Sequence, residues 1–208
     1  MTPTDELRRR WRSLLPGSAG SRSLGEKLLQ RWAEPHRHYH DERHLLEVLE
    51  AVDLLVDEAD DPHAVRLAAW FHDAVYARRP DDEERSATLA TRTLGDLRID
   101  AGLVASVAGL VRMTRHHDPA ADDRDGCVLS DADLAVLGSP PQRYRAYVAA
   151  VRQEYAHVPE GAFRAGRADV LRALLDQPRL FRTRGGSARW EEPARRRLRA
   201  ELDALTAG

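Results

Sequence analysis

A histidine and an aspartate occur together where the surrounding sequence predicts a buried helix. His72 and Asp73 directly follow the segment AVRLAAWF, which is almost wholly apolar. Removing the Asp73 carboxylate from water costs several kcal/mol unless a cation pairs with it. A divalent metal ion is such a cation, and the neighbouring imidazole is a second ligand for the same ion. The pair therefore predicts a metal site at the end of this helix.

A third candidate ligand, His44, lies on the apolar face of another predicted helix. Asp41 is a suitable N-cap for this helix, because its carboxylate accepts hydrogen bonds from N–H groups of the first turn. His44 shares a face with Val48 and Leu55, so we expect its imidazole to point into the protein. His40 lies one turn earlier, where it either packs against the fold or contacts the site.

The segment DADL offers two aspartates, Asp131 and Asp133, of which we expect one to bind the ion. They are separated by about 200° around a helix, so both cannot point at one ion. Asp133 shares a face with Leu129 and Leu137, which we expect to be buried. We therefore predict Asp133 as the ligand. Asp131 is then either a hydrogen-bond acceptor behind the ligands or an acid that stabilises the helix N-terminus.

These residues form a mixed set of two imidazoles and two carboxylates: His44, His72, Asp73 and Asp133. Such a set suits Mn, Fe, Co, Ni, Zn or Mg better than a metal that selects thiolates. Four protein ligands leave water positions open on an octahedral ion, and a bound water can become a hydroxide nucleophile. We therefore expect a divalent metal ion as the cofactor.

The order His, His-Asp, Asp resembles the HD superfamily of metal-dependent phosphohydrolases, in which these four motif residues bind the metal. Six segments further resemble one subgroup of predicted HD phosphohydrolases: RHYHDERHLLEVL, AAWFHDAVY, DDEERSA, DADLAVLG, VRQEY and GR-x-x-VL. The resemblance runs from about Arg31 to Leu205. The four-residue pattern alone is weakly specific, whereas the six segments in this order are strongly specific for the subgroup.

The resemblance implies a hydrolase that acts on a small phosphomonoester or phosphodiester, such as a nucleotide. Asp73 would then be both a metal ligand and the base for the attacking water. Glu83 would be a general acid or base, or would orient the water, although an acid at a helix N-terminus also stabilises the helix. The chain departs from the subgroup at Asp82, where an asparagine is expected before the glutamate.

Three arginines are candidates for binding the substrate phosphate, because a guanidinium group matches phosphate geometry: Arg37, Arg152 and Arg167. Arg152 and Arg167 have a structural alternative, in which they pair with Glu154 or Asp169 at the surface. We slightly favour this pairing.

Two other functions fit the same residues. Some HD proteins resemble mixed-valent di-iron oxygenases, which need further histidine ligands, and His40 and His117 are the candidates, with Asp131 behind the ligands. His117 alternatively meets the dipole at a helix C-terminus. The third hypothesis is a module without catalytic activity that senses nucleotides or binds a protein and whose metal is structural.

The elements that must position these residues are all helices. Apolar residues recur with helical spacing and strand patterns are nearly absent, which predicts an all-α fold. We expect one domain over residues 1–208, a compact bundle of the HD type with about eight to ten helices. Its metal-binding core covers about residues 31–156, and C-terminal helices in 160–208 pack on this core.

The first two expected helices begin at Asp41 and after Pro62, and a third follows the loop 78–82. A fourth covers 101–117, and a short fifth ends before Gly138, which would be its C′ residue. Three more are expected from Pro140, over 163–175 and over 193–205. Loops are expected at 118–126 and over RTRGGSARW at 182–190, where glycine favours mobility. The tyrosines at helical spacing in the segment 144–155 are expected in the core.

The composition excludes several other classes of protein. The net charge is −2 and opposite charges are interspersed, so we expect no nucleic-acid partner. The single cysteine, Cys127, permits no intramolecular disulfide, which fits a reducing compartment. No apolar run is long enough to span a bilayer, so we expect a cytoplasmic protein without a membrane partner, acting on a small molecule.

Overall fold

The computed structural model describes residues 2–207, and its regular structure is helical, without a strand in this range, as the periodicity predicts. Met1 and Gly208, the ends of the expected domain, lie outside the described residues. The α-helices are α1 (Pro3–Leu14), α2 (Ala19–Trp32), α3 (Glu42–Leu54), α4 (Pro62–Phe71), α5 (Asp82–Asp96), α6 (Ala101–Met113), α7 (Arg124–Leu134), α8 (Pro141–Glu154), α9 (Glu160–Asp176), α10 (Arg184–Gly186) and α11 (Glu192–Thr206). Short 3-10 turns, η1 (Val56–Glu58) and η2 (Ala135–Gly138), and a π-helical turn, η3 (Ser187–Glu191), connect them. No helix in the described range is long and apolar enough to cross a bilayer.

Capping residues fix the ends of the two helices that carry the candidate histidines. Asp41 accepts hydrogen bonds from the N–H groups of residues 43 and 44, so the predicted N-cap of α3 is confirmed. Asp61 caps α4 in the same way. The helix ends at Phe71, so His72 follows directly from a turn whose side chains are fully buried.

The chain differs from the expected pattern between α6 and α7. The helix expected to reach His117 ends at Met113, and His117 has a left-handed backbone with φ of 49°, which no α-helix continues. The following helix begins at Arg124, inside the expected loop, because Asp123 accepts a hydrogen bond from the N–H of Gly126 and so caps it.

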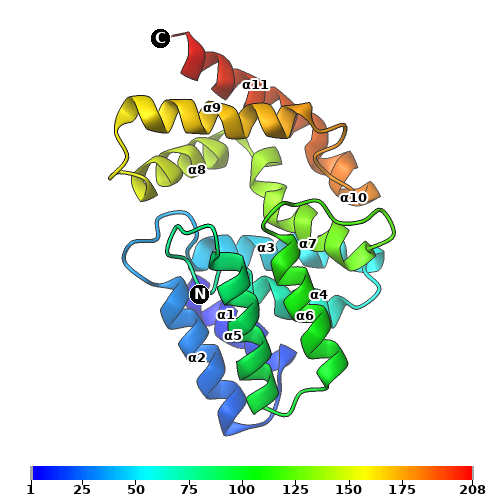
Figure 1. Ribbon diagram of the computed structural model, residues 1–208. Coiled ribbons are helices and arrows are strands. Elements are labelled where there is room, and N and C mark those ends of the chain that lie inside the picture. Colours follow the sequence, from blue (N-terminus) through cyan, green and yellow to red (C-terminus); the bar gives the residue numbers. More distant parts are fainter. Residues whose placement is uncertain (1, 208) are drawn as a thin grey trace.

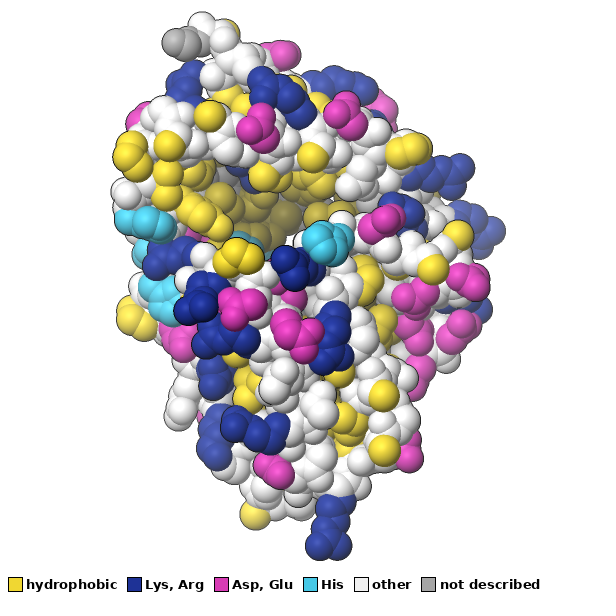
Figure 2. Space-filling view, viewed as in Figure 1, with side chains coloured by type: hydrophobic (Ala, Val, Ile, Leu, Met, Phe, Trp, Pro, Cys, Tyr) yellow, Lys and Arg dark blue, Asp and Glu magenta, His cyan; other side chains and the backbone are white. Residues whose placement is uncertain are grey.

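The helices form two groups, each around its own core. Helices α1–α7 enclose the larger core, which includes Leu7, Leu45, Trp70 and Leu129. Helices α8, α9 and α11 enclose the smaller one and lie above the first group in Figure 1. Trp190 packs against both cores. Figure 2 shows a hollow between the two groups, with hydrophobic side chains on its wall and histidine at its rim.

The two groups are close-packed where η2 meets η3. A Cβ atom on Gly138 would lie 2.5 Å from Cβ of Trp190, so only glycine fits at this position. Gly138 does not have the positive φ of the expected C′ residue, since Gly17 is the one glycine with a positive φ among residues 2–207. The prediction was therefore wrong about the reason for the glycine: close packing requires it, not a left-handed turn.

The segment 182–190, which the glycines suggest is a mobile loop, is a helical segment held by two carboxylates. Asp131 accepts the N–H groups of Arg182 and Thr183, and Glu58 accepts those of residues 184 and 185. A Cβ on Gly186 would lie 2.3 Å from Oδ2 of Asp131. The glycines therefore allow the carboxylates to approach the backbone, which fixes the segment instead of loosening it.

We predict that Asp131→Asn destabilises the protein by about 1–3 kcal/mol. Arg182 and Thr183 donate to different oxygens of Asp131, so an amide places its NH₂ group against one of these donors. Urea unfolding measures the change. Asp169→Asn, at an exposed position, is the control and should change the stability by less than about 0.5 kcal/mol. Equal stability of the two variants would contradict this role for Asp131.

Candidate metal centre

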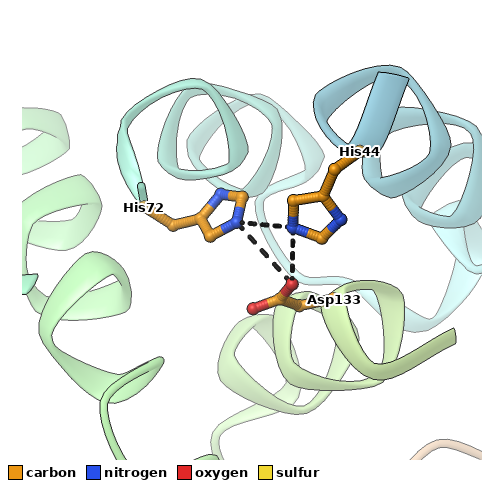
Figure 3. Close-up of side chains that lie close together, drawn as sticks. All are labelled: His44, His72 and Asp133. Atoms are coloured by element: carbon orange, nitrogen blue, oxygen red, sulfur yellow. Dashed lines mark hydrogen bonds and ion pairs between the residues drawn. The ribbon is translucent and has the colours of Figure 1, made fainter. Parts of the chain in front are cut away.

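The candidate ligands come from three helices of the larger core that pack on one another. His44 lies in the first turn of α3, His72 is the C-cap of α4, and Asp133 lies in the last turn of α7. Helix α3 contacts both α4 and α7, and α4 contacts α7. Figure 3 shows that the side chains of the three residues point toward one another. His44 and His72 are only 2 % and 1 % exposed.

The ligand atoms of these three side chains lie within 4.8 Å of one another. Nε2 of His44 is 3.2 Å from Nε2 of His72 and 3.1 Å from Oδ1 of Asp133, and the distance from His72 Nε2 to the same oxygen is 3.6 Å. The residues are far apart in the sequence, and packing of three helices brings them together. Two imidazole nitrogens and a carboxylate oxygen at this separation can bind a single divalent ion.

Asp73 adds a second carboxylate to the group. Its Oδ2 lies 3.2 Å from Nε2 of His72 and 3.9 Å from Nε2 of His44. The backbone carbonyl of Asp73 accepts a hydrogen bond from Arg37, which holds the residue in place behind the site. The structure thus brings the four sequence-predicted ligands together: His44, His72 and Asp133 form one compact group, and Asp73 adjoins it through the two histidines.

The hydrogen bond of His72 determines which of its ring nitrogens is available to a metal. Nδ1 lies 2.8 Å from the carbonyl oxygen of Ala69, which can only accept, so Nδ1 carries the proton in the neutral ring. Nε2 then presents a lone pair to the two carboxylates. A cation between these groups, either a proton on Nε2 or a metal ion, would balance the two carboxylates, and the donor set therefore fits a metal.

The electrostatics of the group reflect the buried charges. Burial opposes a charge on His72, but Asp73 and Asp133 outweigh it and raise the pKa of His72 to about 9. For Asp73, burial favours the neutral acid, but His72 outweighs it and lowers the pKa to about 2. The histidines also hold the pKa of Asp133 far below its ordinary value, against the effect of burial. Both carboxylates are therefore ionised at neutral pH, the state in which they bind metals.

His117, a candidate for a second metal, lies on the other side of Asp133. Its Nε2 is 3.5 Å from Oδ2 of Asp133, whereas Oδ1 faces His44 and His72. Burial lowers the pKa of His117, so its ring is neutral at physiological pH. A neutral imidazole beside the second carboxylate oxygen is suited to a second ion that shares Asp133 with the first.

His40 is held by Glu154, a residue that the sequence suggests only as a partner for arginine. Glu154 is buried. It accepts hydrogen bonds from the backbone N–H groups of residues 38–40, from Nδ1–H of His40 and from the hydroxyl of Tyr76. Burial lowers the pKa of His40, but Glu154 outweighs this effect and raises it. The His40 ring stacks on Tyr76 and lines the cavity beside the four ligands.

The two candidate carboxylate ligands lie on the wall of a cavity of about 500 Å³ between the two groups of helices, and His44 and His72 are buried next to them. Asp73, Asp133, His40, His117 and Glu83 all line it. Burial raises the pKa of Glu83, and the nearby Asp73 carboxylate acts in the same direction. A raised pKa brings a carboxylate closer to neutral pH, so Glu83 lies where a general acid or base is needed.

The three arginines expected at the phosphate bind protein groups instead. The Arg37 side chain is fully buried and donates to the carbonyl oxygens of residues 40 and 73. Arg152 pairs with Glu160 and with two carbonyl groups, and Arg167 pairs with Glu201. For Arg152 and Arg167 the sequence favours pairing with a carboxylate over binding of phosphate. Both do pair with a carboxylate, but with Glu160 and Glu201 instead of the expected Glu154 and Asp169. None of the three lines the cavity beside the ligands, and their binding to a substrate phosphate stays a prediction from the sequence.

Two other arginines, Arg78 and Arg79, line the cavity, and sequence reasoning placed them only in a polar loop. Arg78 has a left-handed backbone with φ of 59° and donates to the carbonyl of Glu154. Asp82 accepts the N–H groups of residues 77 and 79 and thereby fixes this loop. The aspartate at the position where asparagine is expected therefore shapes the rim of the cavity. In the sequence, two adjacent arginines next to the loop proline were the feature that could have indicated a phosphate-binding loop.

Comparisons with models of protein families, with curated proteins and with solved structures gave no match. Membership of the HD superfamily therefore stays a prediction from the motifs. The arrangement of the side chains carries the functional conclusion. It consists of two imidazoles and two carboxylates, a further histidine on each side, and a cavity with Glu83 and two arginines on its wall.

Proposed function

We propose that this protein is a metal-dependent hydrolase of small phosphate esters, the function that its resemblance to HD phosphohydrolases implies. The observation that supports the proposal most is that His44, His72, Asp73 and Asp133 lie together, with both carboxylates on the wall of one cavity. These four side chains would hold one divalent ion. When bound, the ion supplies an acidified water and positive charge, which phosphate-ester hydrolysis requires.

The residues around the ligands supply the remaining chemistry. Asp73 is ionised and lies at the cavity, so it can orient a water molecule or accept its proton. Glu83, whose pKa is raised, lines the same cavity and can serve as the general acid or base, or orient the water. Arg78 and Arg79 can neutralise the phosphate from the rim, since the pair of Arg79 with Asp81 is exposed and therefore weak.

We predict that purified protein stripped with chelator regains at least one ion per chain, and hydrolytic activity, when Mn, Fe, Co, Ni, Zn or Mg is added. The measurements are metal analysis by mass spectrometry and release of phosphate or alcohol from a panel of monoesters and diesters. His44→Gln is the control, because it removes one ligand and exposes any contaminating phosphatase. Metal-loaded protein that hydrolyses no ester would count against a hydrolase and favour a module with a structural metal.

A two-ion centre is the alternative that a specific contact favours. Asp133 directs Oδ1 toward His44 and His72 and Oδ2 toward His117, the arrangement expected for a carboxylate that bridges two ions. A di-iron oxygenase needs such a bridge. Anaerobic loading with Fe(II) followed by iron analysis separates the two functions, because one iron per chain excludes the oxygenase.

A further inference from the structure

A second cavity opens beside the metal centre, between α8 and α9. Its volume is about 480 Å³, a size typical of sites for small molecules. It shares five lining residues with the first cavity: Tyr39, His40, Tyr147, Tyr155 and Val170. The two cavities are therefore parts of one cleft, and we call the second one the apolar arm. Figure 2 shows hydrophobic side chains in the hollow between the two groups of helices.

The apolar arm is lined mainly by aromatic and aliphatic side chains. Tyr147 was expected in the core, and it is buried there, but its ring and that of Tyr155 also face the arm. Phe163 lies next to Tyr155, with their ring centroids 6.3 Å apart. Val151 and Val158 complete the wall. Such a surface favours an apolar group, and its rings favour an aromatic one.

The charged groups of the arm are already paired, and its remaining polar groups are tyrosine hydroxyls and Nε2 of His40. Arg167 is the one described arginine that lines it, and its guanidinium binds both oxygens of Glu201 and the hydroxyl of Tyr147. His40 uses Nδ1 to bind Glu154. No described carboxylate or carboxamide side chain lines the arm, and these are the groups that would bind the hydroxyls of a ribose or the edge of a base. A nucleoside would therefore find no carboxylate or amide partner among the described side chains of the arm, only tyrosine hydroxyls and one histidine nitrogen.

We propose that the substrate is a phosphate monoester of an apolar, aromatic alcohol, with its organic group in the apolar arm and its phosphate at the metal centre. The inference rests on the proposed function and narrows it. Arg78 and Arg79 are the two described arginines near the phosphate end, and four carboxylates line the same cavity: Asp73, Asp82, Glu83 and Asp133. This balance suits one phosphate rather than a polyphosphate chain.

The substrate test compares three esters whose phosphate is attached to a primary carbon, so that their leaving groups are similar. They are 2-(2-naphthyl)ethyl phosphate, ethyl phosphate and adenosine 5′-phosphate. With the metal-loaded protein, we expect kcat/KM for the naphthyl ester to exceed that of each other ester by about 10- to 100-fold, the scale on which a hydrophobic pocket discriminates.

The chain offers a matched pair of variants on α9. Gly166 lines the arm, and beyond its own helix no atom lies within 4 Å of a Cβ added to it, so Gly166→Leu is chosen to narrow the arm. Gly161 has the same free space but does not line the arm, so Gly161→Leu is the control. We expect Gly166→Leu to reduce the preference for the naphthyl ester over ethyl phosphate by about 10-fold. Gly161→Leu should leave this preference unchanged.

A binding measurement tests the arm independently of turnover. The probe is 2-(2-naphthyl)ethylphosphonate, which cannot be hydrolysed, titrated into metal-loaded protein by calorimetry. We expect Gly166→Leu to weaken its binding about 10-fold and Gly161→Leu to leave it unchanged. If no ester is hydrolysed but this pattern of binding appears, the proposed function fails and the arm stands as a ligand site.

Two results would overturn the inference while leaving a hydrolase in place. One is hydrolysis of ethyl phosphate or adenosine 5′-phosphate at least as efficient as that of the naphthyl ester. The other is a preference, or a phosphonate affinity, that Gly166→Leu does not change. Absence of phosphonate binding in the unaltered protein overturns it whether or not any ester is hydrolysed.

Discussion

Replacement of Asp133 by asparagine is expected to abolish metal binding. Oδ1 of Asp133 lies 3.1 Å from Nε2 of His44 and 3.6 Å from Nε2 of His72, so it is a member of the ligand set. The amide removes one of the two negative charges that balance the ion. Loss of affinity should therefore exceed the roughly 10- to 100-fold that loss of a group behind the ligands costs. Equilibrium dialysis with metal analysis measures it.

Asp131→Asn is the matched control for this experiment. It makes the same chemical change on the same helix, two residues away, and at a fully buried position. Asp131 binds Arg182 and Thr183, and burial raises its pKa to about 6 against the lowering effect of these hydrogen bonds. We expect Asp131→Asn to lower stability and to leave metal affinity unchanged. Retained metal in Asp133→Asn, or its loss in Asp131→Asn, would reverse the assignment.

The comparison of these two aspartates shows what periodicity can predict. Asp131 and Asp133 lie at different angles around α7, and Asp133 shares the side of Leu129, which is buried. Burial alone does not separate the two aspartates, since Asp131 is fully buried and Asp133 is partly exposed. The same reasoning oriented His44 on α3, where Val48 is buried. Local spacing was informative here because a polar side chain on an apolar face has no alternative to a partner inside the protein.

The role of Asp131 shows where local spacing fails. We expected it behind the ligating histidines, but His72 donates to the carbonyl of Ala69, and Asp131 binds a segment about fifty residues later in the chain. Partners at such distances depend on how the C-terminal helices pack, and no short-range pattern encodes that packing. The same limit explains the arginines: Arg167 meets Glu201 across α9 and α11, which neighbouring residues do not reveal.

The walls of the cavity were equally hidden from the sequence. The helical spacing of Tyr147 predicts a core residue. Its side chain is buried, but it also lines the cavity beside the metal centre. A cavity arises where two packed groups of helices do not meet, so a residue at its edge keeps the pattern of a core residue. Periodicity identifies which side of a helix is covered, but not whether protein or a ligand covers it.

Metal affinity is also expected to depend strongly on pH, because the ion competes with a proton on His72. Burial disfavours that proton, but the carboxylates of Asp73 and Asp133 outweigh burial and raise the pKa of His72 to about 9 in the metal-free protein. Nδ1 donates to Ala69, so the proton that must leave is the one on Nε2, the atom that faces the other ligands. An ion that binds Nε2 must displace it.

The direction of the effect follows from this competition. Below pH 9 most metal-free molecules carry the proton, so apparent affinity should rise about tenfold for each pH unit between pH 7 and pH 8.5. In the metal-free protein, the charged His72 stabilises the fold fully below its unfolded pKa of about 6.5, and this stabilisation is lost as the pH rises through about 9. Calorimetry in buffers of different ionisation enthalpy should detect about one proton released per ion at pH 7. An affinity that is flat over this range, with no proton released, would show that Nε2 of His72 is not a ligand.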